Sequence, residues 1–254
     1  MKRKILLPVP TYGFDPTEAA IPWKILTSGG FDVHIATPGG KQARADEIML
    51  TGEGLGLFKP LLMARRDAIS AYAEMEGSSA FRKPISYAGI NPDDYDGIFL
   101  PGGHHKGVRE YLESEILQRI IPVFFKAEKP VGAVCHAPVL LSRSINPESG
   151  KTVLYGYRTT ALLKSQERLA YHLTRRRMGD YYLTYPGTTV EDEVRKVLRS
   201  QRDFRKGPLP LFRDKPGGLF GGFVVRDRNY VSGRWPGDIY SLTRAFGGLF
   251  STTV

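Results

Sequence analysis

Residues 131–141 read VGAVCHAPVLL, and this stretch decides how the rest of the chain is interpreted. Its first four residues predict a short buried strand, and the Ala137-Pro138 pair predicts a helix that begins directly afterwards. Cys135 therefore falls on a strand-to-helix turn, with Ala133 and Ala137 two residues away on either side. A nucleophile elbow needs such small residues at these two positions, because its backbone is strained. The stretch thus predicts a nucleophile raised above a sheet.

The same alternation of strands and helices extends outward from this turn. Expected strands are residues 5–9, 31–37, 97–100 and 131–134, with a strand pair at 222–226 and 230–232. Expected helices are 15–26, 60–75, 114–127, one from Ala137, 162–174, 190–198 and one from Asp238, with loops at 41–57 and 203–218. Such alternation forms βαβ units and a parallel sheet. We expect one α/β domain over residues 1–254, a three-layer sandwich with helices on both faces of a mostly parallel sheet.

Three loops are predicted to meet at the carboxyl edge of that sheet, where open α/β folds bind their ligands. They are residues 11–18, 102–106 and 135–136. Glu18 lies in the first turns of the helix that follows the first loop, within reach of the thiol. An ionised Glu18 would oppose a thiolate, whereas a protonated one would donate a hydrogen bond to it. We therefore expect Glu18 to work as a neutral acid.

The remaining loop residues suggest how a reacting carbonyl would be held. The N-terminus of the helix after Cys135 is expected to favour a thiolate and the oxyanion of the reaction. The backbone N–H groups of His136 and Gly103 are the expected oxyanion donors, because glycine allows a ligand to approach the chain closely. Gly102 and His104 belong to the same loop and are expected to contact the substrate.

Composition places the chain among ordinary globular proteins, with 41% hydrophobic and 24% charged residues. A single cysteine excludes an internal disulfide and a cysteine-built zinc cluster, which suits a reducing compartment. The basic residues 1–4 are followed by an apolar run that stops at Pro8, which is too short for a signal peptide. No stretch approaches the roughly 20 apolar residues of a membrane span. We expect a cytoplasmic protein with no membrane partner.

The positive charge is concentrated in one part of the chain. Residues 151–228 contain 17 Lys/Arg against 8 Asp/Glu, which accounts for most of the net charge of +10. This segment includes three consecutive arginines at 175–177. A basic surface attracts polyanions in general, but no zinc-finger, RNA-recognition or basic-zipper pattern accompanies it. We therefore expect a solvated basic face and treat nucleic-acid binding as the weakest alternative.

Three motifs in this order resemble the ThiJ/PfpI superfamily. They are residues 18–22 (EAAIP), 100–104 (LPGGH) and 133–138 (AVCHAP). The resemblance covers roughly residues 1–160, and it extends weakly to residues 231–236 (VSGRWP). It implies a flavodoxin-like fold of the class I glutamine amidotransferase-like type.

Within that superfamily, the chain is similar to the heat-shock branch that includes glyoxalase III enzymes. The resemblance implies a homodimeric lyase or hydrolase that acts on small aldehydes, such as methylglyoxal converted to lactate, without a cofactor or metal. Members of that branch have a Cys-His pair and an acidic residue some thirty positions later. The pair matches Cys135 and His136, and the acidic residue matches Glu167, which would orient His136 as a general base. The helix glutamate that the family places near the nucleophile matches Glu18.

The chain also departs from the family pattern, and other functions remain open. A glutamine amidotransferase needs a distant His followed two residues later by Glu, but His172 is followed by Leu173-Thr174, which argues against glutaminase chemistry. The tyrosine-rich, basic segment 175–218 predicts a lid or a dimerisation surface. The same Cys-His-Glu site would also serve an amidase, a peptidase or a hydratase. A non-enzymatic redox sensor or chaperone, with a low-pKa exposed Cys135 that is oxidised, is the alternative from another class.

Overall fold

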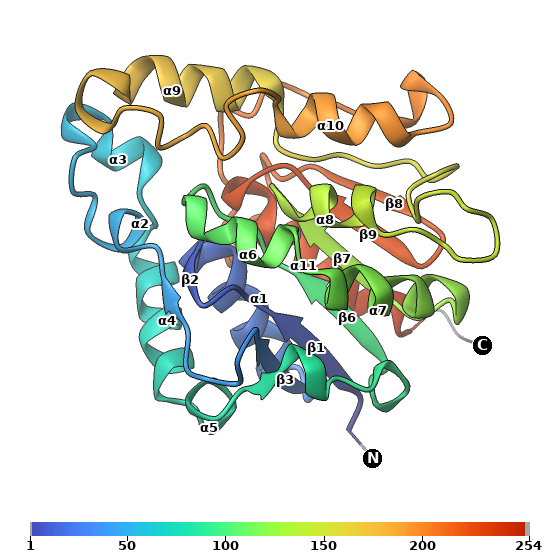
Figure 1. Cartoon of the computed structure of the whole chain (residues 1–254). Helices are drawn as coiled ribbons and strands as arrows, with labels where there is room; N and C mark the ends of the chain where they lie inside the picture. The colour runs from blue at the N-terminus through green and yellow to red at the C-terminus, as the bar shows by residue number, and fades with distance from the viewer. Residues whose placement is uncertain (1, 252–254) are drawn as a thin grey trace.

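The computed structural model describes residues 2–251, and its centre is a seven-stranded sheet (Figure 1). Along the sheet the strands are β5 (Ile85–Ser86), β3 (Asp32–Thr37), β1 (Lys4–Pro8), β6 (Gly97–Leu100), β7 (Val131–Val134), β9 (Tyr230–Gly233) and β8 (Val224–Asp227). A second, two-stranded sheet pairs β2 (Tyr12–Phe14) with β4 (Arg44–Ala45).

All neighbouring strands of the large sheet are parallel except β8, which runs antiparallel to β9 at one edge. When the two-residue β5 is set aside, the parallel strands follow the order 2-1-3-4-5 in chain sequence, which is the flavodoxin-like order. The order reverses at β1, so a crevice opens at the carboxyl ends of β1 and β6. The predicted fold class, a mostly parallel α/β sandwich of flavodoxin-like type, is confirmed.

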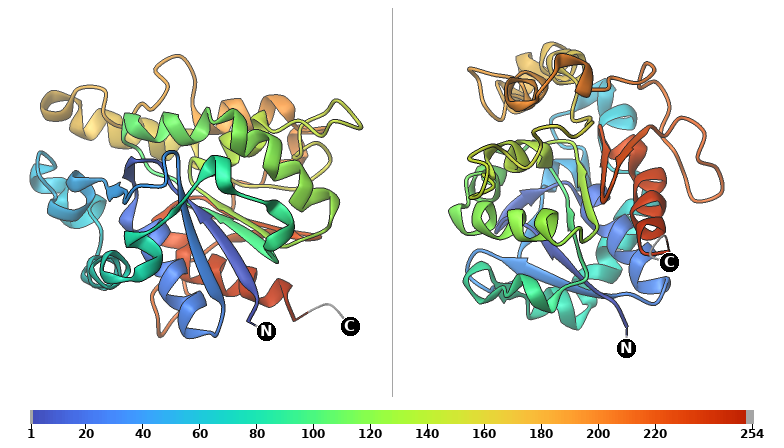
Figure 2. Two further views of the ribbon diagram at one scale, coloured as in Figure 1. Left: turned by 60° about the horizontal axis from the view of Figure 1, so that its bottom comes forward. Right: turned by 90° about the vertical axis from the view of Figure 1, so that its right-hand side faces the viewer.

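Helices cover both faces of this sheet, as the two views of Figure 2 show. One face is covered by α1 (Pro16–Ser28), α4 (Arg66–Gly77) and α11 (Ile239–Leu249), and the other by α6 (Arg109–Leu112), α7 (Glu115–Lys126) and α8 (Ala137–Arg143). The remaining helices are α2 (Glu47–Thr51), α3 (Lys59–Leu62), α5 (Ser79–Arg82), α9 (Lys164–Met178) and α10 (Val190–Val197). Both α9 and α10 lie outside the layers, along the top of the molecule in Figure 1.

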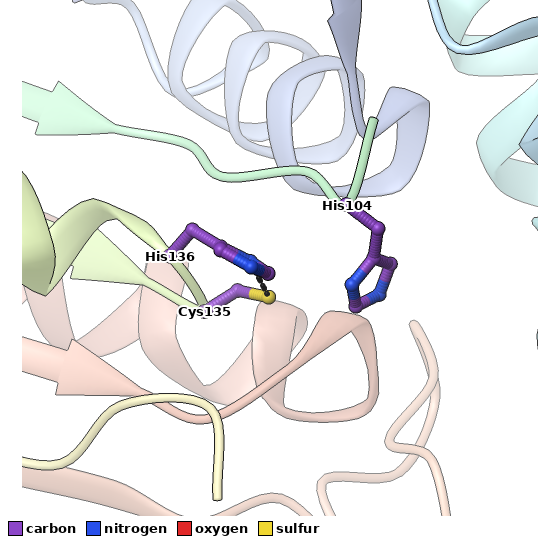
Figure 3. A group of neighbouring side chains, drawn as sticks. All are labelled: His104, Cys135 and His136. Atoms are coloured by element: carbon purple, nitrogen blue, oxygen red, sulfur yellow. Dashed lines mark hydrogen bonds between the residues drawn. The ribbon is translucent and has the colours of Figure 1, made fainter. Parts of the chain in front are cut away.

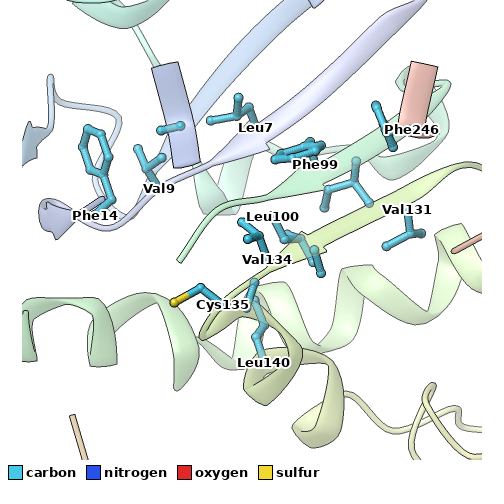
Figure 4. Close-up of a cluster of buried hydrophobic side chains, with 14 of the residues drawn as sticks. Leu7, Val9, Phe14, Phe99, Leu100, Val131, Val134, Cys135, Leu140 and Phe246 are labelled. Atoms are coloured by element: carbon cyan, nitrogen blue, oxygen red, sulfur yellow. The ribbon is translucent and has the colours of Figure 1, made fainter. Parts of the chain in front are cut away.

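The apolar runs of the sequence form the core between these layers. The side chains of β1, β6 and β7 are almost entirely buried, as expected for parallel strands covered on both faces. Phe99 packs edge to face against Phe246 of α11, with ring centroids 5.4 Å apart. Figure 4 shows Cys135 at the end of this apolar cluster, directly after Val134. The core thus fixes the backbone on which the cysteine is carried.

Two expectations about residues 41–75 are wrong. The expected loop at 41–57 contains β4 and α2, because Asp46 caps the start of α2 and Gly52 ends it with a φ of +72°. The expected helix at 60–75 is broken into α3 and α4, since Ala64 leaves the helical path to donate its N–H to Met49 O. The break depends on a contact between segments, whereas α2 has local caps but, at five residues, is too short to show an apolar period.

The segment from 175 to 218 spans the end of α9, all of α10 and the loops around them. Tyr181 and Tyr182, which follow α9, form a small apolar cluster with Met49 of α2 and Leu55. This cluster holds the segment against the body of the protein on the side of the sheet's carboxyl edge. Within residues 2–251, no helix has the length and apolar character that crossing a bilayer requires.

Candidate active site

Cys135 occupies the strained turn that its neighbours predict. It lies between β7 and α8 with a φ of +59°, in the left-handed region that residues with a Cβ rarely adopt. Its N–H donates to Gly233 O of β9 at 3.2 Å, and its carbonyl accepts from Leu162 N at 3.0 Å. These two hydrogen bonds hold the turn in place from both sides. Such strain at the end of a strand is typical of a residue positioned for chemistry.

The thiol of Cys135 is buried, with only 1% of the residue exposed. Burial raises the pKa of the thiol well above its usual value, and the negative charge of Asp15 raises that pKa further. The expectation of an exposed, low-pKa thiolate is therefore wrong. The helix N-terminus is present, but it does not outweigh the loss of water around the sulfur. In the resting protein the sulfur carries its proton.

His136 is the group placed to take that proton. Its Nδ1 lies 3.3 Å from Cys135 Sγ, as Figure 3 shows, and its Nε2 lies 3.0 Å from Thr184 Oγ1. The hydroxyl of Thr184 donates its own hydrogen to His104 O at 2.9 Å. Since a threonine hydroxyl has one hydrogen, it must accept from His136 Nε2–H. This leaves Nδ1 without a hydrogen, so Nδ1 is the acceptor that faces the thiol.

Electrostatics agree with this assignment, because burial lowers the pKa of His136 well below its usual value. The neighbouring His104 lowers the pKa of His136 further. Both the thiol and the imidazole are therefore neutral in the resting state. The pair is arranged like the serine and histidine of a serine hydrolase. In that arrangement the proton moves to the histidine only as the nucleophile attacks.

Thr184 was not among the predicted site residues. It belongs to the tyrosine-rich segment after α9, and 48 residues separate it from His136. Arg109 of α6 fixes its position, because the guanidinium donates to Thr184 O and lies over the ring of Tyr185. No spacing in the sequence indicates this contact. The segment predicted as a lid or dimer surface thus supplies a residue of the site itself.

The predicted pairing of Glu167 with His136 is wrong. Glu167 is buried in the first turn of α9, and its Oε2 accepts from Val190 N at 3.0 Å. The position beside His136 Nε2 is taken by Thr184 instead. Burial raises the pKa of Glu167 to about 7. Glu167 therefore joins α9 to the start of α10 and does not orient the imidazole.

Glu18 lies where the sequence places it, next to the nucleophile. It is fully buried in the first turn of α1, whose N-cap Asp15 accepts from Thr17 N and Glu18 N. Burial raises the pKa of Glu18 well above its usual value, and Asp15 raises it further. A hydrogen bond with Cys135 and one from Gly102 N, at 2.9 Å, oppose this rise only partly. Glu18 is thus a neutral acid beside the thiol.

Gly102 and Gly103 shape the floor of the site in different ways. The N–H of Gly102 already donates to Glu18 Oε2, so this N–H does not serve as an oxyanion donor. A Cβ on Gly102 would lie 2.8 Å from His136 N, so the glycine keeps that N–H open. Gly103 has a φ of +154°, and a Cβ there would meet Gly13 O at 2.6 Å. Within residues 2–251, no backbone carbonyl accepts from Gly103 N or His136 N.

His104 stands between the thiol and the outside. Its ring packs edge to face against His136 and against Tyr182, with centroids 5.2 and 4.9 Å apart. Burial lowers the pKa of His104 to about 4, so the ring is neutral. Its buried Nδ1 has no hydrogen-bond partner among the described residues. This nitrogen is therefore free to bind an atom of a ligand.

One group of side chains has the spacing of metal ligands. His104, Cys135 and His136 each offer one atom, and these atoms lie within 4.8 Å of one another (Figure 3). Two neutral imidazoles are ready ligands, but a metal needs the thiolate form of cysteine. Binding of a metal would therefore release the thiol proton.

A family model described as ThiJ/PfpI family-like matches residues 9–208 of the chain. These residues include Glu18, Gly102, Cys135 and Thr184, together with α9 and α10. The match ends before β8 and β9, which complete the edge of the large sheet.

Individual relatives and a solved structure also resemble the chain. A glutathione-independent glyoxalase of Schizosaccharomyces pombe is 28% identical over 59% of the chain and 60% of its own length. A protein/nucleic acid deglycase of Staphylococcus aureus is 30% identical over 57% of the chain and 47% of its own length. The chain thus spans only about half the length of these relatives. The crystal structure of a glyoxalase III from Candida albicans superposes with a TM-score of 0.71 at 18% identity, covering 97% of each chain, which shows a shared fold.

Proposed function

The chain belongs to the ThiJ/PfpI family, and from this premise we propose that it is a cofactor-independent enzyme that acts on small reactive carbonyl compounds through Cys135. The leading reaction is the conversion of methylglyoxal to lactate. Support comes from the names of the relatives, which include glyoxalases and a deglycase.

One observation supports the proposal above the others: the only cysteine of the chain faces an unprotonated nitrogen. The Sγ of Cys135 is 3.3 Å from His136 Nδ1, and the hydrogen bond with Thr184 leaves that nitrogen as an acceptor. A thiol and a base within hydrogen-bond reach, with the base held by a third group, form the general pattern of an activated nucleophile. The strained turn at Cys135 adds to this pattern.

In the first step the sulfur adds to the aldehyde carbon while His136 Nδ1 takes the thiol proton. The carbonyl oxygen becomes an oxyanion, which the N–H groups of His136 and Gly103 stabilise. His136 then returns the proton to this oxygen, and a neutral hemithioacetal results. The thiol therefore reacts without a standing population of thiolate, in agreement with its raised pKa.

In the second step the hydrogen on the former aldehyde carbon moves to the neighbouring carbonyl carbon. It leaves as a proton to His136, which produces an enediol, and it returns to the adjacent carbon. The product is a thioester of Cys135 with a 2-hydroxy acid. Water then cleaves the thioester, so that one methylglyoxal and one water give one lactate, and the thiol regains its proton. No oxidant, metal or nucleotide enters this balance.

Glu18 acts in this scheme as a neutral acid that donates a hydrogen bond to the sulfur or to the developing oxyanion. Glu18→Gln retains a neutral donor but cannot release a proton, so turnover is expected to fall while the thiol titrates nearly as before. Glu18→Ala and Glu18→Asp are expected to change the pKa of the thiol, measured by alkylation against pH. An unchanged thiol pKa in both variants would argue against this role.

The main test measures lactate formation from methylglyoxal by the wild type and by Cys135→Ser. We expect Cys135→Ser to abolish turnover, because the hydroxyl is a far weaker nucleophile at a site with a neutral base. Undiminished turnover in this variant would overturn the proposal. A panel of small amides, nitriles and peptides separates a lyase from an amidase, a peptidase or a hydratase with the same residues.

The alternative of a redox sensor is less well supported. Oxidation of cysteine follows thiolate character and exposure, and Cys135 lacks both. We keep the expectations of a homodimer and of a cytoplasmic protein as part of the proposal. Sedimentation of the purified protein tests the first expectation.

A further inference from the structure

A cavity of about 270 Å³ lies beneath α9, with His104 of the candidate site in its wall. Its apolar wall consists mainly of Met49, Leu162, Leu169, Leu173, Leu209 and Leu211. Three of these leucines are unusually exposed at its mouth: Leu169 at 58%, Leu209 at 79% and Leu211 at 68%. Since the large core accounts for none of these side chains, their exposure marks the rim of a binding site.

The charged groups in the wall of this cavity already have partners. The guanidinium of Arg213 donates to Met63 O at 3.1 Å and to Leu61 O at 2.5 Å, and it lies over the ring of Trp235. The carboxyl group of Asp15 accepts from two N–H groups at the start of α1. Polar groups that are satisfied in this way do not demand a polar ligand. Most of the remaining wall is apolar, although the buried Tyr182 Oη and Trp235 Nε1 in it have no hydrogen-bond partner among the described residues.

Two residues of the cavity wall adjoin Cys135, which does not itself line the cavity. One is His104, whose ring faces the thiol in Figure 3 and has a nitrogen within 4.8 Å of Cys135 Sγ. Leu162 lies in the same wall, and its N–H donates to the carbonyl of Cys135. The unpartnered Nδ1 of His104 is thus a polar atom between the sulfur and an apolar chamber. A ligand that contacts both the sulfur and the apolar chamber has a carbonyl group at one end and a hydrophobic group at the other.

We propose that this cavity binds the apolar substituent of the substrate, so that the preferred substrates are 2-oxoaldehydes with an aryl or medium-length alkyl group. The inference rests on the proposed function, which it narrows to one substrate class. His104 donates a hydrogen bond from Nδ1–H to a carbonyl oxygen of the ligand, while the leucines surround the substituent. Methylglyoxal, whose substituent is a single methyl group, leaves most of the chamber unused.

The size of the cavity agrees with such a group. A cavity on the order of 150 Å³ with apolar walls holds a benzene ring in another protein. The chamber here is larger, at about 270 Å³, and so accepts a phenyl group beside the reacting carbons. One methylene group in an apolar pocket changes kcat/KM by about tenfold or more. We therefore expect kcat/KM for phenylglyoxal to exceed that for methylglyoxal by at least about tenfold.

Variants at the mouth of the cavity test whether the leucines cause this preference. Leu169→Gln makes an exposed wall residue polar, and Ser165→Phe fills the cavity from an exposed position on the same helix. Both are expected to lower the ratio of kcat/KM for phenylglyoxal to kcat/KM for methylglyoxal by about tenfold, because only the larger substituent occupies the chamber. The matched control is Leu57→Gln, since Leu57 is 94% exposed and lies outside the cavity. Equal kcat/KM for both aldehydes in the wild type, or a preference that persists in both variants, would overturn the inference.

A binding experiment separates this inference from the proposed reaction. Acetophenone resembles phenylglyoxal but lacks the aldehyde, so it reports occupancy without turnover. Trp235 lies in the cavity wall, and Trp23→Phe removes the only other tryptophan signal. In Trp23→Phe/Cys135→Ser, acetophenone is expected to quench the fluorescence of Trp235 saturably, and Leu169→Gln is expected to weaken this binding by about tenfold. If neither aldehyde is turned over but acetophenone still binds in this way, the proposed reaction fails and the apolar site stands.

A second copy of the chain is the other candidate to cover the exposed leucines. Sedimentation of the wild type, Leu169→Gln and Leu57→Gln distinguishes the two occupants. If Leu169→Gln alone dissociates a dimer while the preference for phenylglyoxal is retained, the rim is an interface and the inference is wrong. An unchanged oligomeric state together with a lost preference supports the substrate site.

Discussion

At the scale of single residues, the candidate site consists of groups that are all neutral at rest. Cys135 is a thiol, His136 is an imidazole with its hydrogen on Nε2, and burial keeps Glu18 protonated. Such a site contains no ion pair, which agrees with the high free energy of burying a charged group. The proton of Cys135 moves only when a substrate supplies an atom that can hold the resulting charge. Thr184 decides which nitrogen of His136 receives it.

Thr184→Val removes the hydroxyl that accepts from His136 Nε2–H while nearly retaining the shape of the side chain. We expect kcat to fall by about tenfold to a thousandfold, because the imidazole can then present the wrong nitrogen to the thiol. Thr184→Ser restores the hydroxyl and is expected to recover most of the activity. Nitrogen NMR of His136 gives an independent readout, since Thr184→Val should shift its tautomer population. Full activity with an unchanged tautomer in Thr184→Val would exclude this positioning role.

The raised pKa of Cys135 gives a second prediction at this scale. Alkylation by iodoacetamide follows the thiolate fraction, so its rate should rise about tenfold per pH unit from pH 7 and should still be rising at pH 9. The shape of the profile is diagnostic because limited access lowers the rate equally at all pH values. Since the chain has one cysteine, mass spectrometry reports this thiol alone. A plateau below pH 8 would indicate a thiolate and would restore the redox-sensor interpretation.

At the scale of elements, α9 and α10 form a layer that the sheet does not require. Glu167 joins them, because its buried carboxyl group in α9 accepts from the first N–H of α10. One end of this layer holds Thr184 against His136, and the same layer covers the apolar cavity. The loop between the two helices thus carries the partner of His136, and α9 forms part of the cavity wall.

The pKa of Glu167 predicts how this packing responds to pH. Burial raises the pKa from 4.5 to about 7, so the folded state keeps a proton that the unfolded chain releases near pH 4.5. The folded state binds more protons in this window, and its stability therefore falls as pH rises from about 4.5 to 7, by about 3 kcal/mol in all. Glu167→Gln should remove this contribution. Urea denaturation of both proteins at several pH values measures the difference.

The same variant also tests the role that Glu167 has in the family resemblance. Because Glu167 does not touch His136, Glu167→Gln is expected to keep kcat within about threefold of the wild type at pH 7. If Glu167→Gln lost as much activity as Thr184→Val, the result would instead support Glu167 as the acidic residue that orients His136. A pH dependence of stability that is identical in both proteins would contradict the raised pKa.

At the scale of the whole molecule, a buried ion pair ties the last strand to the long loop before it. Arg234, directly after β9, donates to both oxygens of Asp238 at 2.9 Å, and both residues are fully buried. The guanidinium also donates to the carbonyls of Lys206 and Pro208. The loop that contributes Leu209 and Leu211 to the cavity is thus fastened to the strand that supports the turn at Cys135.

Arg234→Leu leaves Asp238 as an uncompensated buried charge, which is expected to destabilise the protein by about 3–5 kcal/mol. The double variant Arg234→Leu/Asp238→Leu removes both charges and should lose less. Lys24→Ala is the matched control, since its ion pair with Glu74 is exposed and should contribute less than about 1 kcal/mol. Urea denaturation measures all three. A cost for Arg234→Leu no larger than that for Lys24→Ala would contradict the structural role of the pair.

Much of the fold was predictable because its signals are local. The buried strands at 97–100 and 131–134 agree with β6 and β7, and Asp15 and Ser114 cap their helices where the sequence predicts helix starts. The break before α4 was not predictable, because it depends on the contact of Ala64 with Met49, and α2 is too short at five residues for an apolar period, although its caps are local. Apolar periodicity and capping residues act within a few positions, whereas this contact does not.

The sequence by itself determined that Cys135 stands on a strained turn with His136 beside it and Glu18 within reach. That turn follows from steric requirements of adjacent residues, which the alanines on either side satisfy. Only the tertiary structure decided that Thr184, and not Glu167, holds His136, and that the thiol is neutral. The partner of an imidazole depends on which distant segment crosses it, and the pKa of a thiol depends on how completely its neighbours exclude water.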